Sequence, residues 1–184
     1  MRPYLLATAC LAASLLRAEP ASPSLSNPGF EGATLDWIPS AEDIKFGLSK
    51  VTSEAARCGQ KGLRVDQAEG GPGSWIQSKR TAVKPGVRYR IEFWARTINT
   101  SGVGVWVNFF EENWTPIPAP PGPQLAVQVP AEAPEWTAYH IDVVAPANAD
   151  SVTLAVHCYS KRPTMADFDD FTITPLSTPA PGTP

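Results

Sequence analysis

Strict two-residue alternation in three separate runs most restricts how this chain can fold. In residues 89–97, buried-type side chains such as Ile91 and Phe93 alternate with polar or charged ones. The same polarity repeats in residues 103–110 and 152–159. Because successive side chains of a strand point to opposite faces, each run predicts a β-strand with one buried face.

Shorter strand-like runs and many turns fill most of the remaining chain, and no segment has the pattern of a long helix. The shorter runs are residues 44–51, 63–67, 75–78, 139–143 and 171–173. Glycine-containing or proline-containing turns separate them. The proline-rich stretch 113–134 reads as one long loop, and such a loop inside a compact domain is more often functional than idle. We therefore predict a single all-β domain, an antiparallel β-sandwich of the jelly-roll type.

The same alternation places a set of aromatic and hydrogen-bonding side chains outward. Aromatic rings can stack on the apolar faces of a sugar, while polar groups bind its hydroxyls, so this set predicts a carbohydrate platform. Its members are Trp94, Arg96, Trp106, Asn108, His157 and Tyr159. Trp75 is a weaker candidate at the rim. Any one of these residues could instead be structural.

Three further tryptophans have other expected places. Trp37 and Trp136 are expected to anchor the core or a loop. Trp114, in the proline-rich stretch, could close over a ligand or pack on the prolines, and the sequence does not separate these alternatives.

The two ends of the chain predict an exported protein. Residues 1–18 combine Arg2, an apolar run and small residues near a cleavage site, which is typical of a secretory signal peptide. The run is shorter than the roughly 20 residues of a membrane span. Residues 176–184, rich in Pro, Ser and Thr, resemble a disordered tail. We expect a secreted or periplasmic monomer, free of the membrane.

Charge and cysteine content narrow the partners and the covalent structure. The net charge is −3 and the basic residues are scattered, which argues against a nucleic-acid partner. Once Cys10 leaves with the signal peptide, Cys58 and Cys158 remain. In an exported chain such a pair is more often one disulfide than two free thiols, so we predict a disulfide between them.

Three sequence motifs resemble the CenC-type carbohydrate-binding modules. They are LSNPGFE at 25–31, followed by Trp37; AVKPGVRYRIEFWAR at 82–96; and ADFDDFTI at 166–173. The resemblance covers the predicted domain, residues 22–175. It implies a β-jelly roll with a glycan cleft on its concave sheet.

The resemblance also implies which strands and residues serve the ligand. Taking the strands in order, the concave sheet would contain residues 63–67, 89–97, 103–110 and 152–159, which include the outward aromatic set. His157 falls where some xylan- and glucan-binding relatives place a histidine. The expected partner is therefore a polysaccharide of the xylan or β-glucan type. In this order the strand at 63–67 lies beside that at 152–159, bringing Cys58 near Cys158.

A structural calcium ion is the possible cofactor that the resemblance implies. The matching positions are the carboxylates of Glu31 and Asp169 and the carbonyl of Lys61. Cys58 stands where some relatives carry an acidic ligand. The alternative is that the aspartates at 166–173 are solvated charges at a strand edge.

The sequence favours binding without catalysis. Glu111 and Glu112 are adjacent on a predicted strand, so their carboxylates point to opposite faces and do not form a glycosidase pair. One alternative is a jelly-roll polysaccharide lyase that uses His157, Tyr159 and Arg96. The other is a surface adhesion domain that binds no glycan.

Overall fold

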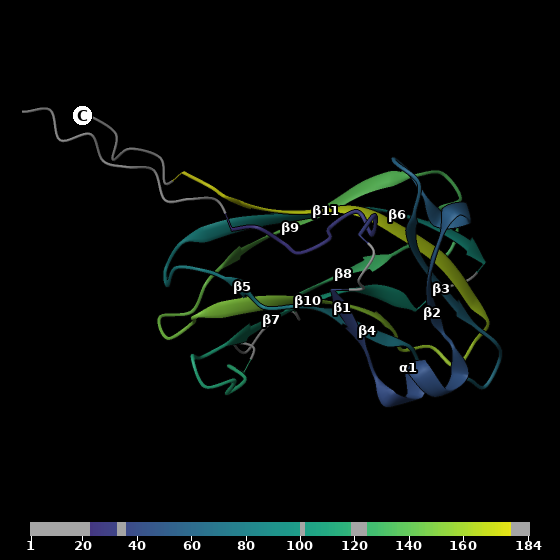
Figure 1. Ribbon diagram of the computed structural model, residues 1–184, viewed down its shortest axis with the longest axis horizontal. Coiled ribbons are helices and arrows are strands. Elements are labelled where there is room, and N and C mark those ends of the chain that lie inside the picture. Colours follow the sequence, from purple (N-terminus) through teal and green to yellow (C-terminus); the bar gives the residue numbers. More distant parts are fainter. Residues whose placement is uncertain (1–22, 33–35, 100–101, 119–124, 178–184) are drawn as a thin grey trace, which may run out of the picture.

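The computed structural model describes residues 23–32, 36–99, 102–118 and 125–177 as two antiparallel sheets packed face to face (Figure 1). Sheet A has the order β1-β4-β10-β7-β8, with β5 paired to β10, and sheet B has the order β2-β3-β11-β6-β9. Sheet A contains β1 (Trp37–Pro39), β4 (Trp75–Ser78), β5 (Thr81–Ala82), β7 (Val103–Phe110), β8 (Ala126–Val129) and β10 (Ser151–Cys158). Sheet B contains β2 (Ser49–Thr52), β3 (Gly62–Gln67), β6 (Arg88–Asn99), β9 (Thr137–Val144) and β11 (Thr164–Pro175). The predicted antiparallel β-sandwich is confirmed.

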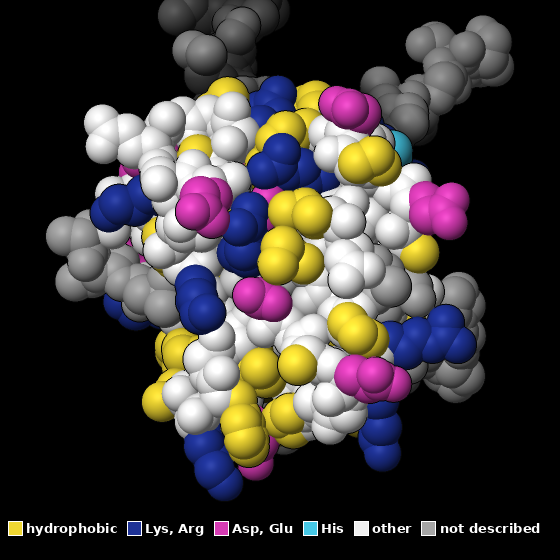
Figure 2. Space-filling model, turned by 90° about the vertical axis from the view of Figure 1, so that its right-hand side faces the viewer, with side chains coloured by type: hydrophobic (Ala, Val, Ile, Leu, Met, Phe, Trp, Pro, Cys, Tyr) yellow, Lys and Arg dark blue, Asp and Glu magenta, His cyan; other side chains and the backbone are white. Residues whose placement is uncertain are grey.

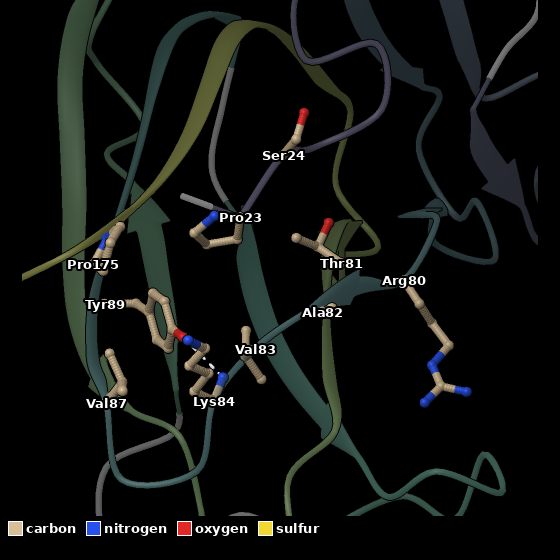
Figure 3. A pocket seen from close by; sticks show the side chains of 10 residues that line it. All are labelled: Pro23, Ser24, Arg80, Thr81, Ala82, Val83, Lys84, Val87, Tyr89 and Pro175. Atoms are coloured by element: carbon tan, nitrogen blue, oxygen red, sulfur yellow. Dashed lines mark hydrogen bonds between the residues drawn. The ribbon is translucent and has the colours of Figure 1, made fainter. Parts of the chain in front are cut away.

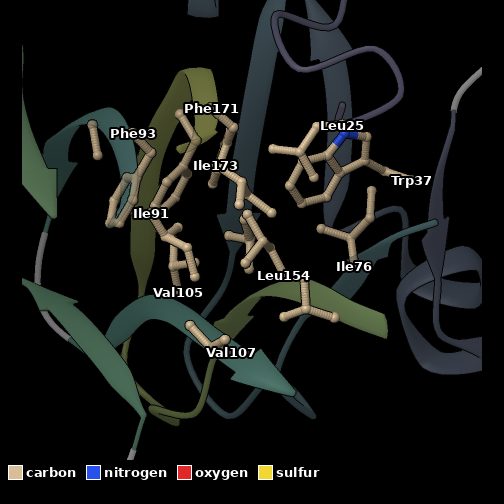
Figure 4. Close-up of a cluster of buried hydrophobic side chains, with 14 of the residues drawn as sticks. Leu25, Trp37, Ile76, Ile91, Phe93, Val105, Val107, Leu154, Phe171 and Ile173 are labelled. Atoms are coloured by element: carbon tan, nitrogen blue, oxygen red, sulfur yellow. The ribbon is translucent and has the colours of Figure 1, made fainter. Parts of the chain in front are cut away.

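The core lies between the sheets and uses the inward half of each alternating run (Figure 4). Ile91 and Phe93 of β6 face inward from sheet B, and Val105 of β7 and Leu154 of β10 face inward from sheet A; all are at most 1% exposed. Burying such side chains stabilises each by about 1.5 to 3 kcal/mol. Alternation therefore separates core from surface correctly in these strands.

Three aromatic rings pack against one another in the core beside the N-terminal segment of the domain. The rings of Phe30, Trp37 and Phe171 lie within 6.0 Å of one another, centroid to centroid, in tilted or edge-on contacts. Trp37 is 1% exposed, which confirms its predicted place in the core.

The predicted strand at 44–51 is wrong in its first half, where the chain forms helix α1 (Ala41–Phe46). The Ser40 hydroxyl accepts a hydrogen bond from Asp43 N at 3.1 Å and caps the helix. Gly47 ends it at φ 60°, a left-handed conformation that favours glycine. A short 3₁₀ helix, η1 (Ser53–Ala55), follows β2. The proline-rich stretch also differs from the prediction, because β8 lies within it.

The strands predicted to form one concave sheet divide between the two sheets. β3 pairs with β2 and β11, whereas β10 pairs with β4, β5 and β7. The chain crosses from sheet B to sheet A between β6 and β7 instead of forming a hairpin. The prediction that β3, β6, β7 and β10 share a sheet is therefore wrong, because strand order in the sequence does not give strand neighbours here.

The predicted disulfide fails for the same reason. Cys58, exposed, lies in the turn before β3 of sheet B, and Cys158, buried, ends β10 of sheet A; both are free thiols. β3 and β10 are not neighbours, so the pairing on which the prediction rested does not exist.

The predicted signal peptide, residues 1–18, lies outside the described residues, as does residue 178 onward in the predicted tail. Within the described part of the chain, no helix has the length and apolar character needed to cross a membrane.

Candidate functional site

Four rings gather on the side of sheet A that faces away from sheet B, here called the outer face of sheet A. They are Trp75 of β4, Trp106 of β7, His157 of β10, and Tyr159, which follows the end of β10. The His157 ring lies 5.0 Å from Trp75 and 5.1 Å from Trp106, and Trp106 lies 5.5 Å from Tyr159, all measured between centroids. We call these four residues the ring cluster. Its edge-on contacts leave Tyr159 46% exposed.

Small residues around Trp106 make room for its indole. Ala155 and Ala126 are its register partners on β10 and β8. Gly104 points to the same face two residues before Trp106, and a Cβ there would lie 2.5 Å from the Val127 carbonyl oxygen and 3.2 Å from the indole. The first contact is shorter than real Cβ atoms make and the second would push the indole aside by a few tenths of an ångström, so a side chain at position 104 would disturb both β8 and the ring.

The backbone holds the His157 imidazole in one tautomer. Nδ1 lies 2.6 Å from the Ser74 carbonyl oxygen, and since a carbonyl only accepts, Nδ1 must carry the hydrogen. In the neutral ring, Nε2 is then a hydrogen-bond acceptor. Trp75, the next residue along β4, is held by its backbone N–H, which donates to Asp43 Oδ2 at 3.0 Å.

A polar pair lies beside the ring cluster on the same face. Asn108 and Thr153 are register partners on β7 and β10. Asn108 Nδ2 and Thr153 Oγ1 are buried without a hydrogen-bond partner among the described residues. An unpaired buried polar group costs about 1 to 3 kcal/mol, so these atoms favour an arrangement in which a water or ligand hydroxyl meets them.

Trp94 and Arg96 lie on the opposite side of the molecule, the outer face of sheet B. Both belong to β6, and each is tied to a neighbouring charged or aromatic group. The guanidinium of Arg57 lies 3.5 Å from the Trp94 ring centroid, and Arg96 stacks over Trp136 at 4.9 Å. The expectation that all six outward residues share one platform is therefore wrong: four lie on sheet A and two on sheet B.

Ion pairs within the chain engage further charged side chains on the outer face of sheet B. Asp167 is fully buried and accepts hydrogen bonds from Arg64 Nε at 2.7 Å and Arg96 Nε at 2.9 Å. Arg90 and Arg88 pair with Asp142 at 2.8 and 3.2 Å, and Arg90 lowers the pKa of that carboxyl. Figure 2 shows one side of the molecule, where basic, acidic and hydrophobic side chains are mixed and no field of a single charge forms.

The residues expected to hold calcium are engaged by N–H groups. Glu31 Oε1 accepts from Gln60 N and Lys61 N, at 2.7 and 2.9 Å. Asp169 Oδ2 accepts from Arg57 N and Cys58 N, and Asp169 Oδ1 accepts from Asp170 N. Three of the four carboxylate oxygens thus face donors, whereas a calcium ligand directs its lone pairs at the ion.

A cationic side chain supplies positive charge beside this carboxylate group. Arg57 Nη1 pairs with Asp170 Oδ2 at 2.6 Å. Burial raises the pKa of Asp169, against the lowering effect of its backbone donors. No group of three or more His, Cys, Asp or Glu side chains suited to a metal occurs within the ranges that the structure describes. The expected carboxylates are therefore already engaged by backbone N–H groups, and calcium binding stays a prediction.

A cavity of about 460 Å³ lies at one end of the sandwich (Figure 3). Pro23 and Pro175 line it together with residues 80–84 and Tyr89, whose hydroxyl accepts from Lys84 N at 2.8 Å. None of the predicted site residues line this cavity. A second, shallower hollow borders Tyr159 and contains Gln128 and Arg162.

The residues considered for catalysis do not form one site. Arg96 lies on the outer face of sheet B, whereas His157 and Tyr159 lie on that of sheet A, so the residue set proposed for a lyase is split. Glu111 Oε1 accepts a hydrogen bond from Asn148.

Comparison with known proteins places this chain in a family. The family model described as "Carbohydrate binding domain" matches residues 22–163. No curated protein sequence matches the chain significantly.

Among solved structures, similarity is at the level of the fold. The enzymatically active domain of tailspike protein 4 of Bacteriophage CBA120 is 12% identical with a TM-score of 0.64; 84% of this chain and 21% of that one are covered. The CBM22-1–GH10 modules of a Clostridium thermocellum xylanase, complexed with xylohexaose, are 18% identical with a TM-score of 0.58, covering 86% and 29%. TmCBM61, in complex with beta-1,4-galactotriose, is 19% identical with a TM-score of 0.55, covering 83% and 97%.

The family match extends over most of the described sandwich and includes all four residues of the ring cluster. The chain therefore belongs to the carbohydrate binding domain family.

Proposed function

We propose that the outer face of sheet A binds a polysaccharide, with xylan the first candidate and β-glucan the second, and that the protein does not turn it over. The observation that carries this proposal is the ring cluster. Aromatic rings supported from below and open from outside are the groups on which a pyranose ring stacks. Tyr159, 46% exposed, is its most accessible member.

The polar groups of this face would orient the sugar. The Nδ1 contact with Ser74 leaves His157 Nε2 as an acceptor for a hydroxyl hydrogen in the neutral ring. Beneath the face, Asn108 Nδ2 and Thr153 Oγ1 are buried with no partner among the described residues, so a sugar reaches them only through a water or a side-chain movement. Hydrogen bonds from fixed groups select the sugar, while stacking adds affinity that depends little on the linkage.

Two structural neighbours support the choice of ligand. One is a module pair complexed with xylohexaose and the other is a module complexed with beta-1,4-galactotriose. Xylan is placed first because one of these neighbours is complexed with xylohexaose, and β-glucan second because the resemblance implies a histidine at the place of His157 in some xylan- and glucan-binding relatives.

A binding role without catalysis is supported by the split of the candidate lyase residues between opposite faces. Export is proposed from the signal-peptide pattern of residues 1–18. We also propose that the protein is a monomer. The ion pairs on the outer face of sheet B support this, since charged pairs satisfied within one chain need no partner subunit.

Affinity electrophoresis in gels that contain xylan, β-glucan or β-1,4-galactan tests the proposal. We expect xylan or β-glucan to retard the protein, and Trp106→Ala to abolish the retardation while Trp136→Ala, on sheet B, preserves it. Assays for new reducing ends and for unsaturated uronates should remain blank. If no polysaccharide retards the protein, the surface adhesion alternative replaces this one; product in either assay would make it an enzyme.

A further inference from the structure

The outer face of sheet A has a second aromatic end, away from the ring cluster, that includes Trp114. Phe110 points to this face because it follows Trp106 and Asn108 at steps of two along β7. The Trp114 ring packs edge-on against Phe110 at 5.9 Å between centroids. Trp114 is 57% exposed, more than any other aromatic side chain on this face.

The backbone of Trp114 is held in a conformation that its side chain disfavours. Its φ is 65°, in the left-handed region where glycine and asparagine are usual. The turn is closed by Trp114 N to the Glu111 carbonyl at 3.2 Å and Glu111 N to the Thr115 carbonyl at 3.0 Å. Bulky residues kept in such a conformation concentrate at functional sites, because stability alone favours their replacement.

A fixed arginine supports one side of the Trp114 ring. The Arg80 guanidinium lies 4.6 Å from the ring centroid. Arg80 is itself immobilised, since it donates to Ser151 Oγ at 2.5 Å, to Asp150 Oδ2 at 2.8 Å and to the Glu111 and Glu112 carbonyls at 3.1 and 3.2 Å. With 57% of Trp114 exposed, much of its side chain remains open to a ligand.

The register gives the distance between the two aromatic ends. From Trp106 to Phe110 is four residues along β7, or roughly 13 Å at about 3.3 Å per residue. The unpartnered pair Asn108 and Thr153 lies between them. Along the strand direction, the face therefore presents aromatic rings first, then polar groups, and then aromatic rings again.

We propose that Trp114 is a second stacking residue for the same glycan, so that a linear chain lies lengthwise along β7 and β10. The glycan contacts the ring cluster at one end and Trp114 at the other, and between them it passes over Asn108 and the fully buried Thr153. This inference rests on the proposed function and adds the length and direction of the binding face. A short oligosaccharide reaches only the ring cluster, whereas a long one reaches both ends.

The variant Trp114→Gly separates a ligand-binding role from a structural one. Glycine adopts φ 65° without strain, and this relief offsets the lost contacts with Phe110 and Arg80, so the melting temperature should change little while the ring is lost. A tryptophan that serves only to cover Phe110 would lower the melting temperature instead. Trp136→Ala is the matched control, because Trp136 is also stacked by an arginine but lies on sheet B.

Isothermal titration with xylobiose, xylohexaose and the corresponding cello-oligosaccharides provides the measurement. For the unchanged protein we expect the hexasaccharide to bind tighter than the disaccharide. Trp114→Gly should weaken hexasaccharide binding by about tenfold, the loss typical of about 1.4 kcal/mol, and leave disaccharide binding unchanged. Trp136→Ala should change neither.

The outcomes distinguish this inference from the proposed function. If the unchanged protein binds and Trp106→Ala weakens binding, but Trp114→Gly binds the hexasaccharide normally, the second stacking residue is refuted and the binding face stands. A lowered melting temperature together with normal binding refutes it as well. If the unchanged protein binds no glycan, both proposals fall.

Discussion

Trp94 on the outer face of sheet B is covered by a guanidinium group, whereas Trp75 and Trp106 on the outer face of sheet A lie against other rings. On sheet B, Arg57 covers Trp94 and Arg96 pairs with the buried Asp167. On sheet A, the rings meet edge-on or tilted, and two buried polar atoms nearby have no partner within the described part of the chain. Both faces contain outward tryptophans beside hydrogen-bonding groups, so residue type alone does not identify a binding face; the strand tryptophans of the two faces differ in whether an arginine among the described residues stacks on them.

The largest effect is expected on folding stability when Asp167 of sheet B is replaced. Asp167→Ala leaves Arg64 and Arg96 without their shared carboxylate, and removing one partner of a buried ion pair costs about 3 to 5 kcal/mol. Urea unfolding should show this loss. Glu54→Gln is the control, because its carboxylate is 73% exposed and pairs with the same Arg64, so its loss should stay below about 1 kcal/mol. Equal losses would contradict the structural role assigned to sheet B.

The second test compares alanine substitutions of one tryptophan from each face. Trp106→Ala should weaken glycan binding by about 1 to 3 kcal/mol and leave the unfolding midpoint nearly unchanged, because the ring faces outward. Trp94→Ala should do the reverse, with normal binding and a stability loss of about 1 kcal/mol from the lost stacking with Arg57. Titration and thermal unfolding of both variants measure this. If Trp94→Ala lost glycan binding, Trp94 would belong to the glycan-binding residues after all.

A smaller effect should follow from the raised pKa of Asp169. Because burial raises the folded-state pKa above the ordinary 3.8, the folded protein holds this proton more tightly than the unfolded chain. The contribution of Asp169 to stability is then full below pH 3.8 and is lost as pH rises through the folded-state pKa. Asp169→Asn lacks this titration, so relative to the unchanged protein it should gain stability as the pH rises from 3.8 through the folded-state pKa. A difference that does not vary with pH would contradict this account.

The smallest expected effect is that of calcium. Since Glu31 and Asp169 accept N–H donors, and Arg57 supplies positive charge beside them, added calcium or a chelator should leave the melting temperature unchanged. Differential scanning fluorimetry with excess calcium and with chelator checks this. A rise with calcium that disappears in Glu31→Gln would restore the calcium expectation.

Much of this fold could be predicted from the sequence because one face of most strands is buried. Alternation separated Ile91 and Phe93 from Trp94, and Leu154 from His157, as the structure does. The same principle does not tell which strands are neighbours, because pairing in a sandwich joins residues far apart in the chain. The split of the six outward residues and the failed disulfide both follow from that missing information.

Some local features carry sequence signals. Ser40 followed by Asp43, with Gly47 after them, is the pattern of a capped short helix, and the predicted strand at 44–51 overlaps the end of that helix. Strand order in the sequence predicts Trp75 at the rim of the platform. It belongs to the ring cluster instead, since β4 pairs directly with β10. No sequence signal could reveal the left-handed backbone of Trp114, because tryptophan is rare in that conformation.

The cavity at one end of the sandwich has a consequence for engineering this domain. Pro23 and Pro175 line the same cavity, and Leu176 N is held by the Arg88 carbonyl at 2.8 Å, so the two ends of the described sandwich leave the molecule close together. Domains whose ends meet tolerate circular permutation and insertion into another protein. A short linker joining these ends, with new termini opened elsewhere, would leave every strand of sheet A in place.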